Sequence, residues 1–228
     1  MDTAHRVALL RDAAPGRLLI HEIYRSIQGE SMFAGLSCVF VRTAVCDSRC
    51  VWCDTPHAFT QGEWLSVDEV LRRALDFDCP LVEITGGEPL LQPDVLPLMA
   101  KLADAGRTVL LETSGAHDVG PVDPRAHIIM DLKCPDSGEC HGNYWPNLDR
   151  LKATDQIKFV VASRRDFDWA AETVRRHDLG GRFTVLVSPV FGAVTPRELA
   201  EWVLASSLPL RMQIQLHKVI WEPTARGV

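Results

Sequence analysis

The chain has 228 residues, of which 46% are hydrophobic, and a formal net charge of −6. This length suits one domain with a sizeable core, and the apolar content excludes a disordered chain. The acidic balance argues against nucleic acid as a partner. No apolar run reaches membrane-spanning length, and the first twenty residues lack the apolar core of a signal peptide. We therefore expect a cytoplasmic protein without membrane contact.

Short β-rich runs alternate with amphipathic helical patterns along most of the chain. Residues 1–17 are expected to form a loose lead-in, and residues 18–228 a single domain. Strands are predicted at residues 37–42, 81–85, 108–113, 127–133, 156–161, 182–189 and 210–218. Helices are predicted at residues 66–75, 93–106, 165–177 and 195–206. Ser66 is a plausible N-cap, and Thr195 with Glu198 forms a capping-box pattern.

This alternation predicts parallel strands joined by right-handed helical crossovers. The strands are too few for a closed barrel, so an incomplete α/β barrel and an open doubly wound sheet both remain possible. In either fold, the functional site gathers at the carboxyl ends of the strands. The segments "CDSRCVWCDT", "TGGEP", "ETSG", "DLK" and "SPVF" all follow or end predicted strands.

Cys46, Cys50 and Cys53 form a C-x3-C-x2-C motif. The chain has seven cysteines, an odd and clustered set, which favours metal or redox use over a disulfide framework. Thiolates select zinc, copper(I) or iron–sulfur clusters. A structural zinc site needs a fourth ligand, which His57 could supply. A [4Fe–4S] cluster held by three cysteines would instead leave one iron open to another ligand.

The motif, with Trp52 before its final cysteine and "TGGEP" at the end of the next strand, resembles the radical S-adenosylmethionine (SAM) superfamily. That resemblance implies an incomplete TIM-like β/α barrel and a [4Fe–4S] cluster whose open iron chelates SAM. An electron passed through the cluster would then cleave SAM to a 5′-deoxyadenosyl radical.

Further segments narrow the resemblance to the 7-carboxy-7-deazaguanine synthase family. They are "EIYRSIQGESMFAGLSCVFVR", "CDT", "TGGEPLLQ", "ETSG", "DLK" and "QLHKVIW…RGV", and they run in the family's order from about residue 20 to the C-terminus. The resemblance implies a lyase that converts 6-carboxy-5,6,7,8-tetrahydropterin to 7-carboxy-7-deazaguanine with loss of ammonia, on the route to queuosine and other 7-deazapurines. It also implies catalytic use of SAM, a role for Mg²⁺ and a homodimer. The chemistry calls for an electron donor such as a flavodoxin or ferredoxin.

Two alternatives stay open. One is a radical SAM activating enzyme that generates a glycyl radical on a partner protein, although the "IQGE" and "QLHK" segments argue against it. The other is a non-enzymatic zinc or iron–sulfur module.

The resemblance assigns roles residue by residue. Cys46, Cys50 and Cys53 would ligate the cluster, and Thr55 would bind Mg²⁺. The residues matched to SAM binding are Trp52, Cys53, Asp54, Gly86, Gly87, Glu88, Asp131, Leu132, Lys133, Ser188, Pro189, Val190 and Phe191. Those matched to substrate binding are Ile27, Gln28, Gly29, Glu30, Arg42, Thr85, His217 and Lys218. Glu112 would act in proton transfer or orient the SAM ribose. Without the family match, "QGE" is a polar loop, Thr55 a turn residue and His217 a packed or surface histidine.

Overall fold

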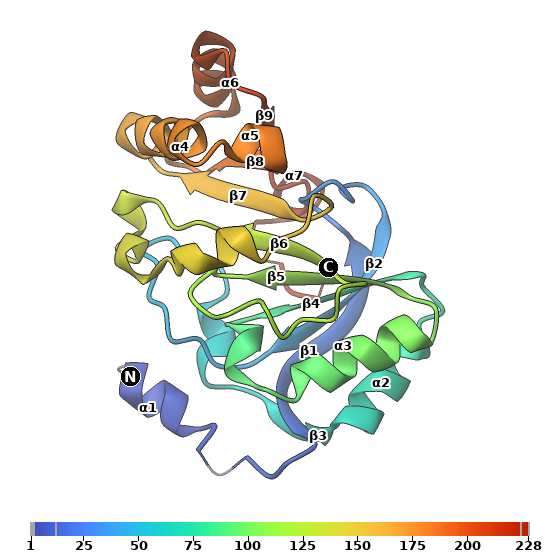
Figure 1. Cartoon of the computed structure of the whole chain (residues 1–228). Helices are drawn as coiled ribbons and strands as arrows, with labels where there is room; N and C mark the ends of the chain where they lie inside the picture. The colour runs from blue at the N-terminus through green and yellow to red at the C-terminus, as the bar shows by residue number, and fades with distance from the viewer. Residues whose placement is uncertain (1–2, 12, 224, 228) are drawn as a thin grey trace.

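The computed structural model describes residues 3–11, 13–223 and 225–227, and in this part of the chain one continuous sheet forms the centre of the molecule (Figure 1). The spatial order of its strands is β3-β1-β2-β4-β5-β6-β7-β8-β9. The strands are β1 (Arg17–Ile27), β2 (Ser37–Thr43), β3 (Glu63–Ser66), β4 (Leu81–Gly86), β5 (Thr108–Thr113), β6 (His127–Asp131), β7 (Gln156–Val161), β8 (Thr184–Pro189) and β9 (Leu210–Met212). The α-helices are α1 (Thr3–Ala8), α2 (Val67–Leu75), α3 (Val95–Asp104), α4 (Arg164–Arg176), α5 (Leu179–Arg182), α6 (Pro196–Ser206) and α7 (His217–Ile220).

From β2 through β9 every neighbouring pair of strands is parallel, whereas β1 is antiparallel to both β2 and β3. The sheet does not close, because β3 and β9 stand at its two ends. The predicted α/β fold with an incomplete barrel is therefore confirmed. The antiparallel hairpin of β1 and β2 was not predicted, because the polar residues of β1 mask its strand pattern.

The side chains of the parallel strands alternate between two faces, as the pleat requires. One face carries aliphatic residues such as Val41, Ile84 and Leu111, which join α2, α3, α4 and α6 in the main hydrophobic core. The opposite face carries a smaller apolar cluster near the start of the strands. Towards the strand ends, this inner face changes to the polar and charged residues Arg42, Thr85, Glu112, Asp131 and Lys158. Helices α2, α3, α4 and α6 thus all cover the first face and leave the second face available for a site.

Two predicted helix starts are confirmed. The Ser66 hydroxyl accepts a hydrogen bond from the Glu69 backbone N–H at 3.1 Å, which begins α2. Thr195 and Glu198 form the predicted reciprocal capping box at the start of α6. Both caps satisfy backbone donors that a helix end leaves unpaired.

The predicted final strand over residues 210–218 is wrong in its second half. Strand β9 ends at Met212, and His217 and Lys218 lie in the short helix α7 instead. The chain leaves the sheet because it crosses to the "QGE" turn, where the Leu216 N–H donates to the Gly29 carbonyl at 3.1 Å. This crossing brings α7 over the inner face of the sheet.

The lead-in segment contains a helix, α1, whose Arg6 side chain is buried. The Arg6 guanidinium lies 4.5 Å from the ring centre of Phe59 and donates to the Ser48 carbonyl at 3.3 Å. The N-terminal segment therefore packs against the loop that carries the three motif cysteines. Across the described residues, no helix has the length and apolar content needed to cross a membrane.

Candidate active site

The loop after β2 carries the three motif cysteines and is tied to its surroundings by backbone hydrogen bonds. The Ala44 N–H donates to Leu19 in β1 at 2.9 Å, and the Val45 N–H donates to Ala58 at 2.8 Å. Cys46 is buried, and desolvation raises the pKa of its thiol to about 12. A buried thiol becomes a thiolate only when a positive charge, such as a metal centre, replaces the lost hydration. All three cysteines line a cavity of about 610 Å³, termed here the outer cavity.

The arrangement of the three sulfurs bears on which metal centre they suit. Within the described ranges, the one group of three metal-ligating residues whose ligand atoms converge to within 4.8 Å is His21, Glu22 and His57. The cysteine sulfurs form no comparable group, and His57 lies with His21 and Glu22 instead of completing a fourth position for them. A mononuclear zinc ion requires its ligands to converge on one point. The donor set fits a polynuclear cluster better, because each thiolate can then bind a different iron.

Gly86 and Gly87, at the end of β4, bring the chain against the cysteine loop. The Gly87 N–H donates to Thr43 at 3.1 Å, and the Glu88 N–H donates to Val45 at 2.8 Å. A Cβ atom on Gly87 would overlap the Val45 carbonyl group and lie 2.9 Å from the Cys46 nitrogen. The glycine is therefore required for the close approach of two backbones beside the cluster motif.

Replacing Gly87 with alanine is expected to displace the cysteine loop. We expect overpacking to lower the free energy of unfolding by about 1–3 kcal/mol and to reduce the iron retained after cluster reconstitution. Thermal unfolding and iron analysis measure the two effects. Gly142→Ala is the matched control, because a Cβ atom there meets nothing within 4 Å. Equal iron retention in both variants would contradict the role given to Gly87.

The residues matched to SAM binding divide into two groups. Those that line the outer cavity are Trp52, Cys53, Asp54, Gly86, Gly87, Asp131, Lys133, Val190 and Phe191. Leu132, Ser188, Pro189 and Glu88 are buried and do not line it. Asp131 accepts a hydrogen bond from Lys133 at 2.7 Å through Oδ2, while its buried Oδ1 has no protein partner among the described residues. This open acceptor is available to a hydroxyl or ammonium group of a bound ligand.

Glu88, which the resemblance matches to SAM binding, does not line the outer cavity. It is fully buried, and its carboxylate accepts hydrogen bonds from the Thr113 hydroxyl and from the Ser114 N–H at 2.8 Å. A further bond comes from the Leu90 N–H at 3.0 Å. Glu88 therefore joins the end of β4 to the end of β5, and its acceptor capacity is used within the protein.

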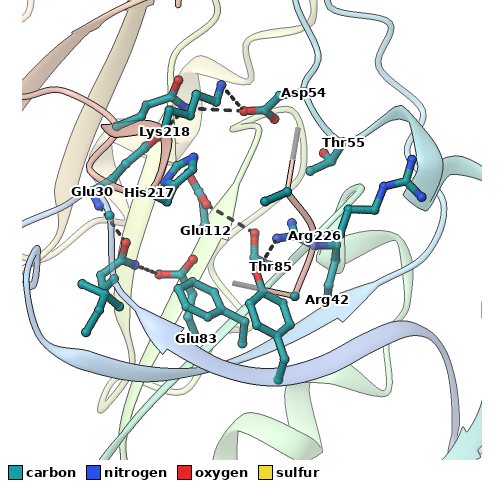
Figure 2. Close-up of a pocket in the computed structure, with 18 of the residues that line it drawn as sticks. Glu30, Arg42, Asp54, Thr55, Glu83, Thr85, Glu112, His217, Lys218 and Arg226 are labelled. Atoms are coloured by element: carbon teal, nitrogen blue, oxygen red, sulfur yellow. Dashed lines mark hydrogen bonds and ion pairs between the residues drawn. The ribbon is translucent and has the colours of Figure 1, made fainter. Parts of the chain in front are cut away.

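A second, smaller cavity of about 200 Å³ lies against the inner face of the sheet (Figure 2); we term it the inner pocket. It is lined by all the residues matched to substrate binding: Ile27, Gln28, Gly29, Glu30, Arg42, Thr85, His217 and Lys218. Helix α7 and residues 225–227 also line it. The "QGE" turn and α7 fit closely, because a Cβ atom on Gly29 would overlap the His217 ring.

Lys158, in the middle of β7, connects the carboxylates of the inner pocket. Its ammonium group donates to Glu30 at 2.8 Å and forms an ion pair with Glu112. Burial disfavours the charged form of Lys158, but Glu112 and Glu30 more than offset this and raise its pKa well above the usual value. Burial likewise raises the pKa of Glu112, and Lys158 outweighs that effect to lower it. The network therefore keeps Lys158 and Glu112 charged in a site largely hidden from water.

Glu83 has the opposite environment. It is buried, and desolvation followed by repulsion from Glu112 raises the pKa of its carboxyl group well above the usual value. Its side chain accepts a hydrogen bond from the Gln28 amide nitrogen, while the Gln28 amide oxygen accepts from the Glu30 N–H at 2.8 Å. Glu83 and the turn backbone thus fix which edge of Gln28 faces the pocket.

Arg42 stands where the two cavities meet. Its Nε donates to Glu22 at 2.8 Å, and its Nη2 donates to the Tyr24 hydroxyl at 3.0 Å. These contacts hold the guanidinium plane and leave further N–H groups for an anionic ligand. Figure 2 shows Arg42 opposite Glu112 and Thr85, with Asp54 and Lys218 above them. The residues that line both cavities are Arg42, Asp54, Thr55, Thr85, Glu112, Lys158, Gln215, Lys218 and Pro223.

Lys158, Glu83 and Gln215 were not predicted as site residues. Gln215 donates to Glu30 at 2.8 Å and thereby links the segment before α7 to the "QGE" turn. Lys158 and Glu83 could have been recognised from the sequence, because each is the single charged residue of its strand. A buried charge requires a partner or a function.

Comparisons with known proteins agree with this geometry. The family model of the radical SAM superfamily matches residues 40–134. The 7-carboxy-7-deazaguanine synthase of Chlorobaculum tepidum is 48% identical over 215 residues, covering 92% of this chain and 97% of the relative. That of Koribacter versatilis is 42% identical, with 92% and 99% covered. The crystal structure of QueE from Escherichia coli shares the fold, with a TM-score of 0.73 at 24% identity, covering 94% of this chain and 98% of that one.

Proposed function

Because the chain belongs to the 7-carboxy-7-deazaguanine synthase family, within the radical SAM superfamily, we propose that it converts 6-carboxy-5,6,7,8-tetrahydropterin to 7-carboxy-7-deazaguanine with loss of ammonia. One structural observation carries this specific reaction. The outer cavity, lined by three cysteines, adjoins an inner pocket lined by carboxylates and an arginine, and the two share lining residues such as Arg42, Glu112 and Lys158. A cofactor in the first would therefore lie directly against a small polar substrate in the second. The reaction serves queuosine and related 7-deazapurine biosynthesis.

The donor set of the outer cavity fits the cofactors of the superfamily. Cys46, Cys50 and Cys53 would hold a [4Fe–4S] cluster, and Asp131 with the Gly87 backbone would contribute to holding SAM. When bound, the cluster and SAM together supply the one-electron radical chemistry. The protein contributes position and exclusion of water. It also supplies fixed charges around the substrate.

The inner pocket matches the chemistry of a carboxylated pterin. The amino-pyrimidinone ring offers N–H donors, which the Glu30 carboxylate can accept once Lys158 holds it in place. Arg42 can bind the substrate carboxylate through the N–H groups that Glu22 and Tyr24 leave free. The compact pocket of about 200 Å³ suits a small ring compound better than a peptide, which favours this reaction over the activation of a partner protein. A homodimer and a flavodoxin or ferredoxin as electron donor belong to the same proposal.

Thr55 is the proposed ligand for Mg²⁺. It lines both cavities beside Asp54, so an ion there would meet hard oxygen donors from the protein and from the substrate. We expect chelation of Mg²⁺ to lower turnover and Thr55→Ala to raise the Mg²⁺ concentration needed for half-maximal rate. Steady-state rates across a Mg²⁺ series measure this. A Thr55→Ala variant with an unchanged Mg²⁺ requirement would remove Thr55 from the ion site.

Complementation tests the proposed function inside a cell that supplies reductant and metals. Expression of this chain in a bacterial strain lacking its own 7-carboxy-7-deazaguanine synthase is expected to restore queuosine in tRNA, measured by mass spectrometry of nucleosides. The Cys53→Ser variant, at equal expression, is expected to give none. Full expression of the iron-loaded protein without any queuosine would overturn the proposal.

A further inference from the structure

Three side chains with metal-ligating atoms meet beside the inner pocket, and none of them is a motif cysteine. They are His21 and Glu22 of β1 and His57 of the single helical turn Pro56–Phe59, and their ligand atoms lie within 4.8 Å of one another. Each is partly buried. Glu22 and His57 also line the inner pocket. Neither histidine takes part in the backbone hydrogen bonds of the cysteine loop or in the ion pairs of Lys158 described above.

A β-bulge makes this meeting possible. In the pairing of β1 with β2, Ile20 lies opposite Thr43 and Glu22 lies opposite Arg42, so His21 is an extra residue without a partner. In a regular strand, two consecutive side chains point to opposite faces of the sheet and could not bind one ion. A bulge re-aims a side chain at such a point. Here it brings His21 and Glu22 together on one side.

The hydrogen bonds around these residues orient them as metal ligands. His21 Nδ1 lies 2.8 Å from the Gln61 carbonyl oxygen, which can only accept, so this nitrogen carries the proton and Nε2 keeps its lone pair. Metal-binding histidines show this same pattern, with the remote N–H held by a carbonyl or carboxylate. The Glu22 Oε1 atom accepts from Arg42 at 2.8 Å, which fixes the carboxylate and leaves its second oxygen available.

We propose that His21, Glu22 and His57 bind a borderline divalent transition-metal ion, such as Zn²⁺, Ni²⁺ or Co²⁺. Two imidazoles and one carboxylate form a three-ligand set that these ions accept, with a remaining position for water. Mg²⁺ prefers an all-oxygen set, so this site is chemically distinct from the ion proposed at Thr55. The ion shares Glu22 with Arg42 and adds positive charge at the edge of the inner pocket. It thereby favours the binding of an anionic ligand there.

Zinc binding to the cluster-loaded protein tests the proposal. The protein is reconstituted anaerobically, freed of loose metal, and dialysed against Zn²⁺, after which zinc and iron are counted in the same sample. We expect one zinc per chain beyond the iron of the cluster. Zinc X-ray absorption should show nitrogen and oxygen ligands at about 2.0 Å and no sulfur at about 2.3 Å. Sulfur ligation would mean that zinc occupies the cysteine motif, and would overturn the proposal.

Variants locate the ion. His21→Gln and His57→Gln are each expected to weaken zinc binding by about tenfold or more. The control is His127→Gln, at the first residue of β6, which is expected to leave zinc binding unchanged. Unfolding temperatures show which variants fold. One folded histidine variant is enough for the comparison of zinc affinity with the wild type. Zinc affinity equal in wild type and a folded histidine variant would refute the site, as would the absence of any additional zinc. The measurement uses no substrate, so its outcome is independent of the proposed reaction.

Discussion

Replacing Cys50 with serine is expected to abolish both cluster retention and turnover while leaving the fold intact. Cys50 lines the outer cavity and is only partly buried, so the loss of its sulfur removes little core packing. With two cysteines left, the cluster loses one of its three protein attachments. Iron and sulfide analysis after anaerobic reconstitution measures cluster retention, and unfolding temperature checks the fold.

Cys140→Ser is the matched control for Cys50→Ser. Cys140 is also a free, partly buried cysteine, but it lies in a single helical turn, Cys140–Gly142, outside the outer cavity. Iron content and turnover are expected to match the wild type in this control. Full turnover in Cys50→Ser would remove the cysteine motif from the cofactor site.

Lys158→Met is expected to destabilise the protein and to inactivate it. The Lys158 side chain is 6% exposed and neutralises both Glu30 and Glu112. Methionine keeps most of the volume but leaves the carboxylates of Glu30 and Glu112 without their cation. Breaking a buried ion pair from one side typically costs about 3 kcal/mol or more. Because Glu30 and Glu112 lose their fixed positions, we also expect kcat/KM to fall by roughly a hundredfold.

Two further variants separate the loss of the Lys158 charge from the change in side-chain volume in Lys158→Met. Lys101→Met removes an ion pair with Asp68 on the surface, where the two side chains are 47% and 80% exposed, and is expected to cost less than about 1 kcal/mol. The double variant Lys158→Met with Glu112→Gln should recover part of the lost stability, since one unpaired charge is removed with the lysine. Chemical denaturation measures all three variants. Equal stabilities for Lys158→Met and Lys101→Met would show that the buried network carries no stabilising charge pairing.

The sequence was sufficient to predict most of the fold because its signals are local. Apolar alternation marked the parallel strands, and the caps at Ser66 and Thr195 marked two helix starts. It also placed the site at the carboxyl ends of the strands, because the cysteine motif, the two glycines and Glu112 each follow or end an apolar run. The family resemblance then supplied the residues of the "QGE" turn, which all line the inner pocket.

The parts that could not be predicted depend on contacts between distant segments. Lys158 and Glu30 are separated by 128 positions in the chain, so no local pattern indicates that they pair. The position of Glu88 in the "TGGEP" motif suggests a ligand contact. Its carboxylate instead accepts hydrogen bonds from Thr113 and Ser114 at the end of the neighbouring strand. The path of the chain after Met212 depends on where the "QGE" turn lies, which is a tertiary property.

An anaerobic assay of the purified, reconstituted protein tests the proposed reaction itself. The mixture contains SAM, a reductant, Mg²⁺ and 6-carboxy-5,6,7,8-tetrahydropterin, and both 7-carboxy-7-deazaguanine and ammonia are measured over time. We expect the two products to form in equal amounts and to depend on SAM and reductant, and we expect Cys50→Ser to form neither. A cluster-loaded protein that cleaves SAM but yields neither product would contradict the proposed reaction.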